Sequence, residues 1–233
     1  LGTHVHGLDG MGNTNPPLPH GRLDDRYAAE FIIDTVKAHP GEITLVPLGP
    51  LTNIGLAVRL EPKIVSQVKE VVLMGGAAYV PGNISPVAEA NIYHDPHAAE
   101  IVFSAGWPVS MVGLDVTTRT RMTPAYLERL YAAGNPAVKL LERIHPCYKA
   151  YFDKHYNMRG TIHTHDPSTI SYLLAPQLYQ VEQVPVHVET EGKCAGQTVP
   201  DRHQQWGSRP PTNVLVAVDE PAVLQLLFEL LTK

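Results

Sequence analysis

The feature that most constrains this chain is an alternation of short apolar runs with amphipathic stretches. The apolar runs have the length of buried parallel strands and cover residues 43–48, 71–74 and 109–116. Helical periodicity lies around and between them, over residues 28–36, 51–60 and 95–105. Because parallel strands are joined by helical crossovers, this order predicts an α/β fold with an open, mostly parallel sheet flanked by helices.

The second half of the chain continues this alternation with longer helical stretches. The expected elements are a helical pattern over residues 123–156 with breaks at Asn135-Pro136 and Pro146, a helix from Asp166-Pro167 to about Leu174, strands over residues 184–189 and 214–219, and an amphipathic helix from Pro221 onward. Residues 1–22 are rich in Gly, Pro, Asn and His, which predicts a loop.

The composition narrows the class of protein. A length of 233 residues fits a single α/β domain, which we expect over residues 1–233. The 18 basic residues are outnumbered by 23 acidic ones, giving a net charge of −5, so we expect no nucleic-acid partner. No apolar run has the length of a membrane-spanning helix and the N-terminus has no signal-peptide pattern, so we expect a cytoplasmic protein that does not contact membranes.

The carboxyl ends of the predicted strands are the places to look for a ligand site, since open α/β sheets bind ligands there. Two glycines follow Met74, and they allow the backbone to approach a ligand closely. The loop beyond them carries Asn83, Glu89 and Asn91, whose short, directional hydrogen-bonding groups would suit a polyhydroxyl ligand. The alternative is a surface loop stabilised by turns of its own Asn side chains.

Two histidine-containing stretches are further candidates. In the first, His4 and His6 would point to one face of a strand, with a spacing that zinc hydrolases use; the alternative is a polar loop with exposed histidines. In the second, Asp166 either caps the following helix or ligates a cation. His165 beside it is either a surface residue or a general acid, since the pKa of free histidine is near neutral.

Several longer stretches together resemble the nucleoside hydrolase family, the inosine–uridine-preferring nucleoside N-ribohydrolases. The resemblance extends over nearly all of the chain and keeps the family's order of motifs. The matching stretches are HVHGLDGMG (4–12), ITLVPLGPLTNI (43–54), VVLMGGAAYVPGN (71–83), AEANIYHDPHAAEIVF (88–103), MVGLDVT (111–117), HDP (165–167) and GQTVPD (196–201).

This resemblance implies an enzyme that uses water to cleave the N-glycosidic bond of ribonucleosides, releasing ribose and a purine or pyrimidine base. It also implies a Ca²⁺ ion that chelates the ribose 2′- and 3′-hydroxyls and the attacking water, and a homo-oligomer, either a dimer or a tetramer. The resemblance implies that the Leu48 carbonyl and the Asp166 carboxylate ligate the metal, and that Asn83, Glu89 and Asn91 bind the ribose. It implies that Met74 lines the sugar pocket and that His165 assists the departing base. His6 and Tyr156 would lie near the base.

The chemistry of the reaction agrees with these residue types. Cleavage builds positive, oxocarbenium-like charge on the ribose, which nearby carboxylates and amide oxygens stabilise. Ca²⁺ takes six to eight oxygen ligands, of which two vicinal hydroxyls supply two. A leaving base departs more easily when an imidazole donates a proton or a hydrogen bond to it.

The chain also departs from the family pattern. The family's first strand is followed by a DxDxGxDD motif that supplies Ca²⁺ ligands and the general base, and this motif does not occur in the 233 residues. We therefore expect an N-terminally truncated domain that lacks the opening strand or strands of the sheet and is inactive on its own. A smaller departure is Ala90, where the family often has Phe.

Three alternative interpretations remain open at this point. Two HxH pairs, His4 with His6 and His163 with His165, would fit a zinc amidohydrolase. That class requires an eight-stranded barrel, however, and the sequence shows only about five strand-like runs. A non-catalytic relic that binds nucleoside or ribose would keep the same polar loop. A structural subunit would pair with a second chain that carries the aspartates.

Overall fold

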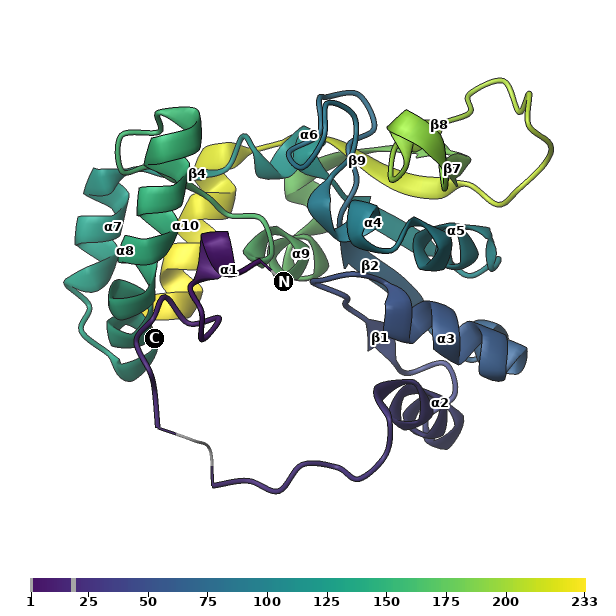
Figure 1. Ribbon diagram of the computed structural model, residues 1–233, viewed down its shortest axis with the longest axis horizontal. Coiled ribbons are helices and arrows are strands. Elements are labelled where there is room, and N and C mark those ends of the chain that lie inside the picture. The colour runs from purple at the N-terminus through teal and green to yellow at the C-terminus, as the bar shows by residue number, and fades with distance from the viewer. Residues whose placement is uncertain (1, 18–19) are drawn as a thin grey trace. The chain divides into compact units, whose positions relative to one another are not determined.

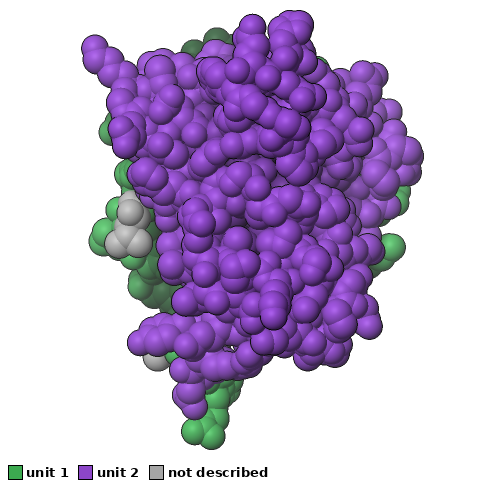
Figure 2. Space-filling view, turned by 90° about the vertical axis from the view of Figure 1, so that its right-hand side faces the viewer, with its two compact units in different colours: residues 1–23, 119–164, 220–233 green, residues 24–118, 165–219 purple. Residues whose placement is uncertain are grey.

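The computed structural model describes residues 2–17 and 20–233 (Figure 1). Part of the loop predicted over residues 1–22 therefore lies outside the described residues. The chain separates into two compact units, which Figure 2 colours differently. Unit 1 comprises residues 1–23, 119–164 and 220–233, and unit 2 comprises residues 24–118 and 165–219. The assignment of residues 1–233 to one domain stays a prediction.

Unit 2 contains a five-stranded sheet in the order β1-β2-β3-β9-β6. Its strands are β1 (Thr44–Leu45), β2 (Glu70–Met74), β3 (Val109–Val112), β9 (Thr212–Val218) and β6 (Tyr179–Val184). Neighbouring strands from β1 to β9 pair in parallel, and only β6 runs antiparallel to its neighbour. The predicted open, mostly parallel α/β sheet is thus confirmed.

Helices cover both faces of this sheet. Figure 1 shows α3 and α5 along one face and α9 against the other. The helices of unit 2 are α2 (Ala28–Ala38), α3 (Thr52–Leu60), α4 (Ala90–His94), α5 (Pro96–Ser104), α6 (Leu114–Thr117) and α9 (Pro167–Leu174), with 3-10 turns η1 (Pro62–Ser66), η2 (Pro176–Leu178) and η3 (Gly192–Cys194). Burial on both faces explains why Val71, Val72 and Leu73 of β2 form a continuous apolar run.

Three expected strands differ from the structure for local reasons. The run 109–116 ends as a strand at Val112, because Gly113 turns the chain into α6. The run 43–48 is a regular strand only over Thr44–Leu45, although the carbonyl of Pro47 also accepts the N–H of Met74. The run 184–189 is divided at Pro185, which has no N–H to donate to a ladder. The strand β7 (Val186–Val188) begins after it and pairs with β8 (Thr198–Pro200).

Unit 1 is mostly helical. It contains α1 (Thr3–His6), α7 (Pro124–Tyr131), α8 (Pro136–Tyr156), α10 (Glu220–Thr232) and a two-stranded ladder of β4 (Arg121–Met122) with β5 (Ile162–His163). The expected break at Asn135-Pro136 is confirmed, because Asn135 caps α8 by accepting from the Val138 N–H at 2.9 Å. The break expected at Pro146 is wrong, since α8 continues through it.

In the part of the chain that the structure describes, no helix is both long and apolar enough to cross a bilayer.

Candidate active site

Glu89 is the most buried of the predicted site residues, with 2% of its surface exposed. It is the N-cap of α4, and its Oε2 accepts hydrogen bonds from the N–H groups of Gly76 (3.1 Å), Asn91 (2.9 Å) and Ile92 (3.3 Å). Burial raises the pKa of the Glu89 carboxyl, and the nearby negative charge of Asp166 also raises it, against the opposing effect of the three N–H donors. The Glu89 side chain is therefore fixed in place, near a second carboxylate.

Asn91 joins this group to the end of β2. Its Nδ2 donates to the carbonyl oxygen of Met74 at 3.0 Å and contacts the Met74 Sδ at 3.3 Å. Asn83 lies on the same loop, and its Oδ1 accepts from the N–H of Ala90 at 2.9 Å. The structure thus brings together the four residues predicted to bind the sugar, at the carboxyl end of a parallel strand. The alternative, turns stabilised by Asn side chains within the loop alone, does not account for the bond from Asn91 to β2.

His165 is held by a residue that the sequence analysis did not identify. Its Nδ1 lies 2.8 Å from the Oγ1 of Thr117, a fully buried residue of α6. Proton exchange with a ligand would therefore involve Nε2 of His165. Thr117 is the last residue of the matching stretch MVGLDVT (111–117). Its hydrogen bond to His165, however, becomes visible only in the tertiary structure.

Asp166 does not have the helix-capping role that its position favoured. Its backbone is already helical, and its side chain accepts no capping hydrogen bond from α9. The residue lies at the protein surface, yet desolvation by the surrounding atoms raises the pKa of its carboxyl to about 6. Its charge acts on the nearby Glu89 carboxyl. An uncapped carboxylate beside a second one favours a bound cation at this place.

Leu48 lies beyond the end of β1, and its side chain is 43% exposed. The preceding residue, Pro47, accepts the N–H of Met74 at 3.0 Å, which joins this segment to β2. Leu48 thus follows one parallel strand as Met74 ends the next, so both residues belong to the carboxyl edge of the sheet. This position agrees with a ligand contact through the Leu48 carbonyl.

His6 and Tyr156 belong to unit 1, where they lie in a row of aromatic rings. His6 stacks on Tyr148 with 5.7 Å between the ring centroids. The centroids of Tyr148 and Phe152 are 4.7 Å apart, and those of Phe152 and Tyr156 are 5.6 Å apart. The loop predicted over residues 1–22 is wrong at Thr3–His6, which form α1. His4 and His6 are therefore not on a strand, and residues two apart in a helix do not share a face.

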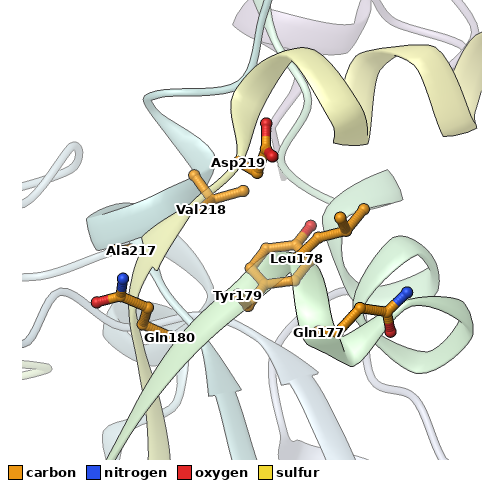
Figure 3. Close-up of a pocket in the computed structure, with 7 residues that line it drawn as sticks. All are labelled: Gln177, Leu178, Tyr179, Gln180, Ala217, Val218 and Asp219. Atoms are coloured by element: carbon orange, nitrogen blue, oxygen red, sulfur yellow. The ribbon is translucent and has the colours of Figure 1, made fainter.

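The described residues contain no group of three or more His, Cys, Asp or Glu side chains arranged to hold a metal ion. The HxH pairs therefore form no zinc centre there, and the open five-stranded sheet is not the barrel of a zinc amidohydrolase. A cavity of about 250 Å³ lies where β6 and β9 meet η2 (Figure 3), lined by Gln177, Leu178, Tyr179, Gln180, Ala217, Val218 and Asp219. It contains none of the predicted site residues.

Comparisons with known proteins identify the family of this chain. Residues 2–225 match the family model described as inosine-uridine preferring nucleoside hydrolase. The chain belongs to this family. An inosine-uridine preferring nucleoside hydrolase of Leishmania major is 44% identical over 220 residues, which are 93% of this chain and 69% of that protein. A probable uridine nucleosidase 2 of Arabidopsis thaliana is 38% identical over 232 residues, covering 97% of this chain and 72% of that protein.

A solved plant nucleoside hydrolase has the same fold, with a TM-score of 0.94 at 37% identity. The match covers 98% of this chain and 74% of the plant enzyme. The chain is therefore a hydrolase by family. The reaction of this family is hydrolysis of the N-glycosidic bond of ribonucleosides. The small-molecule nucleoside substrate that the sequence analysis expected fits this family.

Proposed function

We propose that this nucleoside hydrolase acts on ribonucleosides at the carboxyl edge of the unit 2 sheet, with Ca²⁺ as cofactor and a calcium-bound water as nucleophile. The observation that carries the proposal is the Asp166 carboxylate, which is uncapped, desolvated and close to the Glu89 carboxylate. A hard divalent cation is the group that such oxygen donors prefer.

The residues present fit calcium in kind, although they supply only part of its coordination shell. The Asp166 carboxylate and the Leu48 carbonyl are hard oxygen donors, whereas Ca²⁺ takes six to eight. When bound, the ion supplies Lewis-acid chemistry that makes a coordinated water more acidic and holds vicinal hydroxyls. The prediction that the 233 residues are inactive without further ligands and a general base stays a prediction.

The remaining roles follow from the side chains themselves. Asn83, Glu89 and Asn91 bind the ribose hydroxyls, and Met74 lines the sugar pocket. The Glu89 charge stabilises positive charge that develops on the ribose as the bond to the base breaks. His165 donates a proton or a hydrogen bond to the departing base from Nε2, since Thr117 engages Nδ1. A place near the base for His6 and Tyr156 stays a prediction. A homo-oligomer and a cytoplasmic location are further parts of the proposal.

Calorimetric titration with CaCl₂, followed by D-ribose, tests this proposal. We expect ribose to bind the Ca²⁺-loaded chain more tightly than the chain in EDTA, and the Asp166→Asn variant to lose this difference. Equal ribose affinity with and without Ca²⁺ would contradict the metal role. Inosine and uridine are then compared with their 2′-deoxy analogues in an assay of base release. Base release from inosine or uridine would refute the predicted inactivity of the 233 residues, whereas Ca²⁺-dependent ribose binding without base release would agree with it.

A further inference from the structure

The loop that follows β2 is held through its backbone amides. Four successive N–H groups, those of residues 76–79, each donate to a side-chain acceptor from another segment. The pairs are Gly76 with Glu89 Oε2 (3.1 Å), Ala77 with Thr198 Oγ1 (2.9 Å), Ala78 with Asp115 Oδ2 (2.9 Å) and Tyr79 with Asp115 Oδ1 (2.8 Å).

Asp115 contributes two of these four bonds. It is 3% exposed, and in the described part of the chain no basic side chain forms an ion pair with it. Its neighbour Leu114 donates its own N–H to the carbonyl of Gly76 at 2.8 Å. The turn after β3 therefore hydrogen-bonds to the loop through both the Asp115 carboxylate and the Leu114 backbone N–H.

The loop also fixes a residue of the proposed ribose site. The Gly76 N–H is one of the three donors on Glu89, and Gly76 has φ +86°, where a side chain would be strained. A Cβ at this position would also lie 2.7 Å from the Met111 Sδ. Position 76 therefore requires glycine for its N–H to reach Glu89 in this conformation.

We propose that Asp115 is a positioning residue for ribose binding: by holding the amides of Ala78 and Tyr79, it keeps the Gly76 N–H on Glu89. Asp115 itself does not contact the substrate. The effect on ribose binding rests on the proposed function. The restraint of the Gly76 N–H by Asp115, the structural half of the inference, is argued from the hydrogen bonds alone.

The test is the Asp115→Asn variant of the full 233-residue chain. Asn has the size of Asp but one acceptor oxygen, so one of the two amides would face an NH₂ group. Amide hydrogen exchange, measured residue by residue by NMR, is compared with global stability from urea unfolding. We expect exchange at Ala78, Tyr79 and also Gly76 to rise about tenfold more than global unfolding explains, as for one lost buried hydrogen bond.

Asp201→Asn is a matched control. Asp201 is also buried, and its two oxygens accept the N–H groups of Gln205 and Trp206, each at 2.9 Å. This variant should raise exchange at Gln205 and Trp206 and leave Gly76 as in the wild type. Faster exchange at Ala78 and Tyr79 with unchanged Gly76 in the Asp115→Asn variant would overturn the positioning role.

Ribose affinity in the presence of Ca²⁺ gives the second readout. We expect Asp115→Asn to weaken ribose binding about tenfold, in line with the lost hydrogen bond, and Asp201→Asn to leave it unchanged. Unchanged affinity in Asp115→Asn overturns the inference while the proposed function stands. If the wild type binds no ribose, the proposed function fails, and the exchange at Gly76 still decides the structural half.

A second variant covers the case in which Asp115→Asn does not fold. Thr198→Val removes the acceptor of the Ala77 amide, the one between Gly76 and the two amides on Asp115. Both Asp115 bonds remain in this variant, so Gly76 should stay protected if Asp115 holds its N–H on Glu89, while exchange at Ala77 rises. A rise at Gly76 as large as at Ala77, with Ala78 and Tyr79 still protected, would assign the positioning role to Thr198 and overturn the one proposed for Asp115.

Discussion

The two units differ in how desolvation acts on their ionisable side chains. In unit 2, desolvation raises the pKa values of two carboxyls, Glu89 and Asp166, and their charges repel each other. In unit 1, His145 is 9% exposed and bonds through Nδ1 to the hydroxyl of Tyr131 at 2.6 Å. Desolvation, and less so the charge of Lys149, lower the pKa of His145 to about 4.

This difference separates a structural site from one suited to a ligand. Neutral His145 has a hydrogen-bond partner in Tyr131, so no bound ion is needed to stabilise this part of unit 1. The two carboxylates of unit 2 concentrate negative charge, and a bound cation would stabilise both. Within unit 2 the two carboxylates also differ, because Glu89 is held by three N–H groups and Asp166 by no capping bond.

The largest effect is expected for Glu89→Ala. This change leaves the N–H groups of Gly76, Asn91 and Ile92 without their acceptor. Since each unsatisfied buried donor costs about 1–3 kcal/mol, the free energy of unfolding should fall by roughly 3 kcal/mol or more. Urea unfolding measures this change. A loss below about 1 kcal/mol would mean that water replaces Glu89, and the contrast with Asp166 would disappear.

The next effect concerns pH and unit 1. The pKa of His145 is about 4 in the folded chain and about 6.5 in the unfolded chain, so the unfolded state binds more protons between these values. Stability should therefore be complete above pH 6.5 and fall by roughly 3 kcal/mol towards pH 4. His145→Asn should remove this part of the pH dependence in urea titrations. An identical pH profile for the variant and the wild type would refute the assignment.

A smaller effect is expected for Thr117→Val, which keeps the shape of the side chain and removes the hydroxyl that contacts His165. The loss of one hydrogen bond should cost about 1 kcal/mol of stability. The ¹⁵N chemical shifts of the His165 ring should change at the same time, because the partner of Nδ1 is gone. Unchanged ring shifts would show that another group orients His165.

The smallest effect on stability is expected for Asp166→Asn. The carboxylate makes no capping bond, and desolvation raises its pKa to about 6, so the charged form is disfavoured in the folded chain at pH 7. Because the residue lies at the surface, where solvent screens its charge, neutralising it should raise the free energy of unfolding only slightly, by about 0.5 kcal/mol in the absence of metal. Thermal unfolding in EDTA measures this. A large destabilisation would assign Asp166 a structural role and weaken the comparison with Glu89.

Much of unit 2 could be predicted from the sequence because its signals are local. The apolar run at Val71–Met74, the Asp95-Pro96 start of α5 and the helix after Asp166 all appear as predicted. The loop residues Asn83, Glu89 and Asn91 were identified because they follow a strand and lie close together in the sequence. Boundaries were less predictable where single residues decide them, as at Gly113 and Pro146.

The sequence by itself determined the alternation of strands and helices, the family and the set of candidate residues, since these depend on periodicity and on motifs a few residues long. Only the tertiary structure decided that Asp166 leaves its helix uncapped, that Thr117 meets His165, and that Asp115 and Thr198 hold the loop after β2. The physical reason is distance along the chain: the Ala77 amide and the Thr198 hydroxyl are 121 residues apart, and no local pattern encodes a hydrogen bond that folding alone creates.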